Sequence, residues 1–527
     1  MSASRLFVLA LIACLALPAT ALGASIAAAP PRAEGEGPYP QLILRGLTVV
    51  DGTGAPAYGP VDLVIEDNRI ARIVRVGHPG HPITPSARPA LAEGGREIDL
   101  TGHYVLPGLV DLHGHIGGVE QGVDAEYVYK LWLGHGITTV RDPGCGNGID
   151  WCVSESARSA ANRITAPRIV PFAFFGMDHD GPITRPEQAR QWVRDMKKRG
   201  AQGMKCFGHR PDILAAAFEE LAAQGMRSAC HHAQLDVARV NALDTARRGL
   251  TTVEHWYGLP EALFDGQTVQ NYPPDYNYQN EQHRFAEAGR LWAQAAAPGS
   301  AHYEAVIGEM LALDLTLDPT FTIYEATRDF MRARTAEWHA EYTHPALWDF
   351  FRPGRDRHGS FFFDWGSEEE VVWRDNYRRW MAFVNDYKNR GGRVTVGSDA
   401  GYIYKVYGFA TIEELELLRE AGFHPLEVIR AATLHGAQAL GMAERIGSIE
   451  AGKLADLLIV EGNPLANLKR LYGTGHLQLD AAGEMRRVGG VRYTIKDGII
   501  HDARALLGQV RQKVDEARQQ RGWKPLP

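Results

Sequence analysis

The sequence of 527 residues has few cysteines, no cluster of basic residues and no long apolar run beyond its first segment. No later segment reaches the roughly 18 consecutive apolar residues that a membrane-spanning helix needs. Five cysteines are too few for a disulfide scaffold in a chain of this length. Lysine and arginine number 56 against 63 acidic residues, so the net charge of −7 offers nucleic acid no basic surface. We expect neither a nucleic-acid partner nor an integral membrane span in the mature protein.

The first residues have the layout of an export signal. Arg5 precedes an apolar stretch, and small residues follow it up to Ala24. We assign residues 1–24 to a cleaved signal and expect a periplasmic or secreted mature protein. Lipid attachment at Cys14 is the less favoured alternative, because Cys14 comes early and apolar residues continue after it.

The two ends of the chain share short β-branched runs that are separated by Asp-Gly and Gly-rich turns. This pattern covers residues 40–105 and returns at residues 436–505. We interpret both segments as parts of one small β-sandwich domain. Residues 506–527 are expected to form a C-terminal helix or tail.

Between those segments, apolar strand-like runs alternate with helical patterns, as is typical of parallel βα units. The eight runs lie at residues 105–113, 137–142, 168–175, 203–207, 227–231, 251–255, 315–321 and 393–399. The helical patterns at 186–200 and 211–225 both end in glycine, as helices often do. The sequence therefore predicts an α/β fold, with a (β/α)8 TIM barrel over residues 106–435.

The predicted barrel is longer than the usual ~250 residues. The excess is an insertion at about residues 260–375 that is rich in Trp, Tyr and Phe. We expect it to form a lid or an extra wall over the barrel mouth. A dimerisation surface is supported almost equally, so a homo-oligomer is left open.

Ionisable side chains stand at the ends of five predicted strands, on the barrel face where catalytic residues gather. They are His113, His115, Lys205, His231, His255 and Asp399. Each one alone could be a core histidine, an ion-paired lysine or a helix cap. Together they indicate one site, because independent structural uses would not place them all at strand ends.

The spacing of these residues suggests a metal centre. His113 and His115 are two residues apart, so on extended backbone both imidazoles face the same side. Lys205 has apolar neighbours, and a desolvated lysine can lose its proton and react with carbon dioxide. The resulting carbamate has two oxygens that can bridge two cations. The alternative for Lys205 is a side chain that turns outward or pairs with an acid.

Adjacent His231 and His232 must face opposite sides of a strand. The strand phase favours His231 as the inward residue, with His232 as the fallback. Cys206 and Cys230 are then expected to face the helix layer as inert buried cysteines. A bridge between Cys145 and Cys152 is compatible with an oxidising compartment, but the sequence does not fix it.

The chain resembles the metal-dependent amidohydrolase superfamily, in particular its imidazolonepropionase-like and Xaa-Pro dipeptidase-like branch. The resemblance lies in the motifs VLPGLVDLHGH, GITTVRD, GAQGMKCF, GLTTVEH, TVGSDAG and AATLHGAQALGMAERIGSIEAGKLADLLIVEGNPL. It covers about residues 41–260 and 390–500. His435 stands where related sequences usually have Asn, and the aromatic insertion has no counterpart.

The resemblance implies two divalent metal ions, with zinc as the expected metal. It assigns His113, His115 and Asp399 to the first ion and His231 and His255 to the second. A carbamylated Lys205 and a hydroxide would bridge the two ions. The implied reaction is hydrolysis of a C–N bond in a small-molecule substrate such as a dipeptide or an N-acyl amino acid, with Asp399 as the catalytic proton carrier.

Loops after the other strands are expected to contact the substrate. The candidates from these loops are His209, Tyr257, Tyr324 and Arg328, with Arg141 and Asp142 considered as well. Two other functions stay open. One is a mononuclear deaminase, lactonase or cyclic-amide hydrolase on the same fold, and the other is a non-catalytic exported ligand-binding protein.

Overall fold

The structure is a computed structural model that describes residues 25–355 and 357–522. The predicted export signal, with Cys14 in it, lies outside the described residues. Within the described part, no helix is both long enough and apolar enough to cross a membrane.

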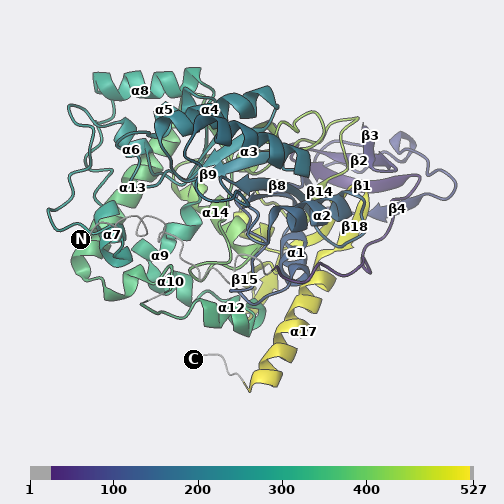
Figure 1. The fold of residues 1–527 in the computed structure, drawn as a ribbon. Coiled ribbons are helices and arrows are strands. Elements are labelled where there is room, and N and C mark those ends of the chain that lie inside the picture. Colours follow the sequence, from purple (N-terminus) through teal and green to yellow (C-terminus); the bar gives the residue numbers. More distant parts are fainter. Residues whose placement is uncertain (1–24, 356, 523–527) are drawn as a thin grey trace, which may run out of the picture.

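Eight parallel strands in chain order form the central sheet, of which β8 and β9 are labelled in Figure 1. They are β6 (Leu109–Asp111), β7 (Ile137–Gly144), β8 (Arg168–Phe174), β9 (Gly203–Cys206), β10 (Arg227–Cys230), β11 (Thr252–Glu254), β12 (Thr316–Asp318) and β13 (Arg393–Val394). Each strand overlaps one of the eight predicted runs. The α/β class and the parallel order of the strands are therefore confirmed.

The two edges of this sheet come together beyond the ends of β6 and β13. Leu112 N–H donates to the carbonyl of Val396 at 2.8 Å, and Asp399 N–H donates to that of His113 at 2.8 Å. The sheet is thus curled, with the segments that carry His113 and Asp399 side by side.

The two helices predicted most clearly are α3 (Pro186–Arg199) and α4 (Pro211–Ala223). Ala189, Trp192, Val193 and Met196 make a buried stripe along α3, at the spacing of one helix face. Gly200 follows α3 with φ of 103°, a left-handed conformation in which glycine avoids the steric cost of a side chain. Both predicted helices are confirmed.

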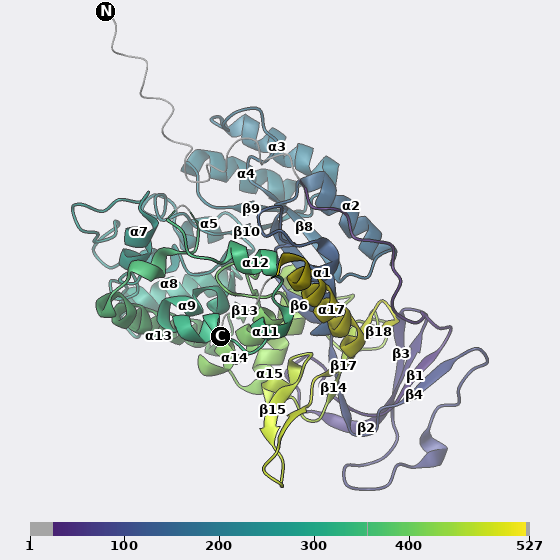
Figure 2. The same cartoon turned by 90° about the horizontal axis from the view of Figure 1, so that it is seen from below.

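The other helices that follow strands β6 to β11 are shorter than α3 and α4. They are α1 (Ala125–Gly134), α2 (Ile149–Ala160), α5 (Ala242–Ala246), α6 (Leu259–Ala262), α7 (Glu281–Ala288) and α8 (Ala301–Ala312). Those that follow β12 and β13 are α9 (Glu325–Arg328), α10 (Phe330–Arg334), α11 (His339–Tyr342), α12 (Pro345–Phe350), α13 (Ser367–Asn389), α14 (Phe409–Glu420), α15 (Pro425–Arg430) and α16 (Gly436–Ala439). Helices α7, α8 and α13 lie on the side of the molecule opposite β1–β4 (Figure 2).

Aromatic rings connect the insertion to the ends of the parallel strands. Tyr324, which follows β12, has its ring centroid 5.7 Å from that of His255. Trp373 of α13 stacks on Tyr324 at 6.0 Å and contacts Trp256 at 5.9 Å. The insertion therefore packs directly on the face that carries the predicted site.

Both ends of the chain contribute strands to a second, mixed sheet. Its strands are β1 (Leu42–Val49), β2 (Tyr58–Glu66), β3 (Arg69–Arg75), β4 (Arg96–Asp99), β5 (His103–Pro107), β14 (Leu457–Glu461), β17 (Val491–Lys496) and β18 (Ile499–Asp502). The β domain predicted from the two ends of the chain is thus one mixed sheet. Its strand order is β18-β17-β14-β5-β1-β2-β3, with β4 beside β1. Leu44, Leu63, Leu457 and Ile495 belong to a core of its own.

Two elements near the C-terminus complete the fold. Strands β15 (His476–Leu479) and β16 (Met485–Val488) form a separate two-stranded sheet. Helix α17 (Ala503–Arg521) packs on α1, where Lys513 pairs with Asp124 at 2.7 Å and Glu126 at 2.9 Å.

The prediction that Cys206 and Cys230 are inert buried cysteines in the helix layer is wrong. Cys206 and Cys230 lie opposite each other on neighbouring strands β9 and β10, with Cα atoms 4.6 Å apart, and form a disulfide. They are therefore not free cysteines. Cys145 and Cys152 are buried and free in the described structure.

Candidate active site

The six predicted metal ligands all lie at the C-terminal ends of the parallel strands. They are His113 and His115 after β6, Lys205 in β9, His231 after β10, His255 after β11 and Asp399 after β13. His255 and Asp399 have φ of 62° and 49°, so their backbones turn sharply where the strands end. Such left-handed backbone is rare outside glycine and is found often at functional sites.

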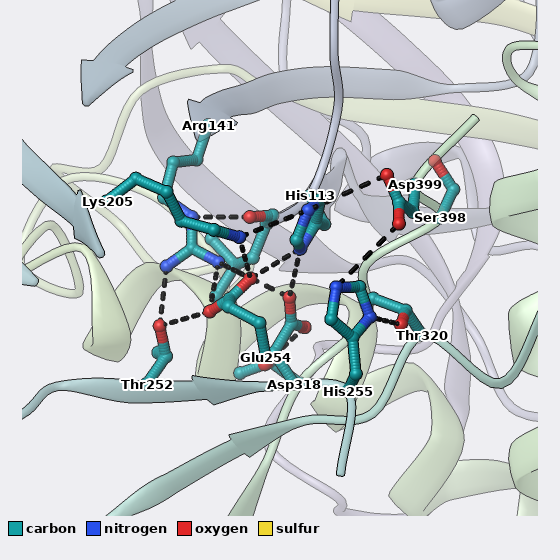
Figure 3. A network of polar contacts seen from close by, with 12 residues as sticks. His113, Arg141, Lys205, Thr252, Glu254, His255, Asp318, Thr320, Ser398 and Asp399 are labelled. Atoms are coloured by element: carbon teal, nitrogen blue, oxygen red, sulfur yellow. Dashed lines mark hydrogen bonds and ion pairs between the residues drawn. The ribbon is translucent and has the colours of Figure 1, made fainter. Parts of the chain in front are cut away.

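Asp399 lies among three histidines. Its Oδ1 is 3.1 Å from His115 Nε2 and 3.7 Å from His113 Nε2. Its Oδ2 is 3.8 Å from His255 Nε2. Donor atoms of His113, His115 and Asp399 all lie within 4.8 Å of one another, a set that fits one divalent cation. Figure 3 shows Asp399 facing His113 and His255.

Only one of the two adjacent histidines faces this group. The ring of His231 lies 4.6 Å from that of His255 and stacks on Phe207 at 4.6 Å. The ring of His232 turns the other way, where its Nε2 pairs with Thr245 Oγ1 at 2.8 Å.

Lys205 points into the interior, because only 2% of its side chain is exposed. Its Nζ lies 3.3 Å from His113 Nε2 and 4.0 Å from Glu254 Oε2. Burial lowers the pKa of Lys205 to about 8, although the nearby Glu254 carboxylate opposes the shift. More of this amine is neutral near pH 7 than in a free lysine, and the neutral form is the one that can react with carbon dioxide.

A buried ion pair lies beneath these residues. Arg141 Nη2 donates to Glu254 Oε1 at 2.8 Å and to Oε2 at 2.7 Å, and Nη1 donates to Thr252 Oγ1 at 2.7 Å. Asp318 Oδ2 lies 3.3 Å from the same guanidinium. With 1% of its side chain exposed, Arg141 belongs to this internal network and offers no surface for a substrate.

Glu254 also fixes the ring of His113. Burial alone would raise the pKa of Glu254, but Arg141 and Lys205 hold it well below its usual range, so the group is a carboxylate. His113 Nδ1 lies 2.5 Å from Glu254 Oε2 and donates its proton to it. The Nε2 lone pair then faces Asp399 and the Lys205 amine, which is the orientation that metal coordination requires.

His255 is oriented in the same way by a different partner. Its Nδ1 hydrogen-bonds to the hydroxyl of Thr320, a residue that follows β12 and has φ of 51°. Its Nε2 is the nitrogen that faces Asp399.

We expect Glu254→Gln to weaken binding of a divalent ion about 10- to 100-fold, the usual cost of losing a ligand's hydrogen-bond partner. The amide cannot replace the carboxylate as the charged acceptor for His113 Nδ1–H. Ion affinity measured by calorimetry would test this. The matched control is Glu414→Gln, because Glu414 is also buried but bonds Thr322 and no histidine. Equal affinity in both variants would contradict the role of Glu254.

The predicted substrate-contact residues fall into two groups. Tyr257 has its ring centroid 5.1 Å from His231, and Tyr324 is 5.7 Å from His255, so both adjoin the ligands. The His209 ring packs edge-on against Phe175 at 5.7 Å. Arg328 forms two hydrogen bonds with Glu420, at 2.7 and 2.8 Å, so its guanidinium is held away from the histidines.

Sequence reasoning missed the residues that orient the ligands. Glu254 and Arg141 left a signal, because each is a charged residue within an apolar strand run and a buried charge needs a partner. Thr320 left no signal of this kind, since threonines are common in these strands.

The chain is similar to known proteins over parts of its length. The model of the amidohydrolase family matches residues 377–500. An adenine deaminase from Methanoculleus marisnigri is 43% identical over 129 residues, which cover 23% of this chain and 24% of that protein.

Solved structures share the fold over most of the chain. A Xaa-Pro dipeptidase with bound methionine has a TM-score of 0.58 and 18% identity, covering 88% of this chain and 100% of that chain. A bottromycin amidohydrolase has a TM-score of 0.60 and 18% identity, covering 92% and 91%. Residues 377–500 therefore match the amidohydrolase family, and the fold of the solved structures extends over most of the chain.

Proposed function

We propose that the protein hydrolyses a C–N bond of a small substrate, such as a dipeptide or an N-acyl amino acid. The observation that carries the proposal is the meeting of four histidines, Lys205 and Asp399 at one end of the parallel sheet. A non-catalytic binding protein has no need for so many metal-ligand side chains in one place. The structural likeness to a dipeptidase and to an amidohydrolase supports the same bond type.

We propose that these side chains hold two divalent ions, with zinc as the expected metal. His113, His115 and Asp399 would hold the first, His231 and His255 the second, and a carbamylated Lys205 would join them. Burial lowers the pKa of His113 to about 4, so at neutral pH its ring is uncharged and fit to be a ligand. When bound, such ions polarise a carbonyl group and lower the pKa of water toward neutrality.

Asp399 is the residue we propose as proton carrier. Its Oδ1 and Oδ2 face different histidines, so the carboxylate stands in the middle of the group. From there it would take a proton from the attacking water and deliver it to the leaving nitrogen. The proton is thereby conserved, and the products are a carboxylic acid and an amine.

Tyr257 and Tyr324 would form one wall of the substrate site. Both rings adjoin ligand histidines, and Tyr324 is backed by Trp373 of the insertion. We propose that the insertion covers the site and keeps bulk water from the bound substrate. A small substrate fits such an aromatic enclosure better than a polymer does.

A substrate screen tests the proposed reaction. Zinc-loaded protein would be given dipeptides, N-acyl amino acids, lactones and adenine, with release of amine, acid or ammonia followed. Amine release from a dipeptide or N-acyl amino acid, lost on chelation and regained with zinc, is the expected result. Turnover of lactones alone, or none at all with any substrate, would refute the proposal.

A mononuclear deaminase on the same fold is the second candidate. The observation that favours it is the match to an adenine deaminase, although that match covers a quarter of either protein. Metal analysis separates the two functions. The hydrolase requires about two ions per chain and a modified Lys205, whereas a mononuclear deaminase requires about one and leaves Lys205 unmodified.

The two adjacent histidines give an internal test of the ligand set. We expect His231→Asn to lower the metal content by about one ion per chain, because His231 faces His255. His232→Asn is the matched control and should keep the full content, since that ring pairs with Thr245. Metal analysis of both purified variants would test this. Equal metal content in the two variants would contradict the assignment of His231, and not His232, as the ligand.

We also propose that the protein is exported, that its parallel sheet closes into a barrel and that its mixed sheet is a separate domain. The layout of residues 1–24 supports export to the periplasm or the medium, and the Cys206–Cys230 disulfide is consistent with an oxidising compartment. The hydrogen bonds between the edge segments of the parallel sheet support closure into a (β/α)8 barrel. The separate core of the mixed sheet supports a terminal domain that folds around its own interior.

A further inference from the structure

A second group of metal-ligand side chains lies behind His115. Asp142 is in β7, Cys145 is in the turn after it, and Cys152 is in the first part of α2. One donor atom from each lies within 4.8 Å of the others. The carboxylate is 1% exposed and both cysteines are fully buried.

The hydrogen bonds of this group leave the buried carboxyl group of Asp142 without a lysine or arginine partner. Cys145 N–H donates to Asp142 Oδ1 at 3.2 Å, and the thiol of Cys152 donates to Oδ2 at 3.5 Å. In the described part of the chain, the one ion-pair partner of Asp142 is His115, whose Nδ1 lies 3.8 Å from Oδ1. No lysine or arginine of that part pairs with it. A buried carboxylate of this kind is costly unless a cation compensates it.

We propose that Asp142, Cys145 and Cys152 form a separate site for a thiophilic divalent cation such as Zn²⁺ or Cd²⁺. Such ions prefer sulfur ligands, and two thiolates with one carboxylate suit them. Ions such as Mg²⁺ prefer oxygen ligands and would bind this set poorly. On binding, the two thiols release their protons and two sulfur–metal bonds form. The ion would also supply the positive charge that Asp142 lacks.

A disulfide between Cys145 and Cys152 explains the group less well. Oxidation would remove the thiol hydrogen that Cys152 donates to Asp142, leaving that buried oxygen without this donor. It would add no positive charge beside the carboxylate. A cation satisfies the thiols and the carboxylate together.

This site would be coupled to the candidate active site through one residue. Asp142 reaches the thiols with one side and approaches His115 with the other. Binding of an ion would fix the Asp142 carboxylate and thereby the ring of His115. The two ligand sets share no atom, so the inference does not depend on the proposed hydrolase function.

Cadmium is the probe that tests the site, because a cadmium–thiolate bond absorbs in the near ultraviolet. Metal-free full-length protein would be titrated with Cd²⁺ without reductant, so that the Cys206–Cys230 disulfide stays intact. The variants are Cys145→Ser/Cys152→Ser, each single serine variant, and Asp142→Asn. His113→Asn is the control, because it disables the other ligand set and leaves both thiols in place.

The wild-type protein and His113→Asn are expected to gain thiolate absorption, and the double serine variant is not. The double variant should bind about one Cd²⁺ less per chain than the wild type. Asp142→Asn should keep the absorption but bind Cd²⁺ at least tenfold more weakly. Thiol titration in denaturant should count two fewer thiols in the double variant.

Two results would overturn the inference. One is equal absorption and equal Cd²⁺ content in the wild type and the double serine variant. The other is an equal thiol count in these two proteins, since this would mean that Cys145 and Cys152 are already joined. If the double variant does not fold, the single serine variants are compared instead, and unchanged absorption in both would overturn it equally.

Discussion

Replacing Lys205 by alanine is expected to lower kcat/KM for the C–N substrate about a thousandfold. The proposed carbamate would be lost, and with it several kcal/mol of charge stabilisation, at roughly 1.4 kcal/mol for each factor of ten. Formate or acetate should restore part of the activity, because a small carboxylate can occupy the vacated volume. Initial rates with and without the added acid, at constant ionic strength, measure both effects.

The control for this result is Lys198→Ala, which removes an exposed lysine of α3. It should keep the wild-type rate and show no response to acetate. Near-normal turnover of Lys205→Ala would contradict the bridging role. Loss of activity with no rescue by any short carboxylic acid would instead indicate that Lys205 acts as an amine.

Asp399→Asn is expected to reduce kcat by a factor of about a thousand, within the range usual for removing a general acid–base group. The amide keeps the shape of the side chain but can neither accept the water proton nor balance the charge of the histidine ligands. Burial alone would raise the pKa of Asp399, but His113 and His115 hold it well below its usual range, so the loss should be the same throughout the range from pH 5 to 10. Steady-state kinetics between pH 5 and 10, on protein of known metal content, would measure it.

The exposed Asp265 offers the matched change. Asp265→Asn should leave both kcat and the pH profile unaltered. An Asp399→Asn variant that keeps its metal and loses less than tenfold in rate would exclude Asp399 as the proton carrier.

The parallel strands and the ligand candidates could be read from the sequence for one physical reason. Strands covered by helices are continuous apolar runs, so a His or Asp at the end of a run stands out. His255 after the run TTVE and Asp399 after VTVGS are examples. Because the ends of parallel strands meet at one face, side chains far apart in the chain were expected to meet there.

The partners of these side chains could not be read in the same way. The disulfide depends on the register of β9 and β10, which places Cys206 opposite Cys230. The pattern of apolar residues does not determine that register. Arg141 is one of several candidate substrate contacts in the sequence, because the pattern shows its charge but not the direction of its side chain. Its side chain turns inward to meet Glu254, a contact between β7 and β11.

The mixed sheet has a consequence for how the protein is made. Strand β5 pairs with β14, where Pro107 lies opposite Leu457, so all of the parallel sheet is synthesised between these two partners. During translation the first strands have an open edge that stays unpaired until the final strands leave the ribosome. Open edges of this kind invite pairing between chains. A chain that has formed its first strands but lacks β14 would therefore expose the edge of β5 to such pairing.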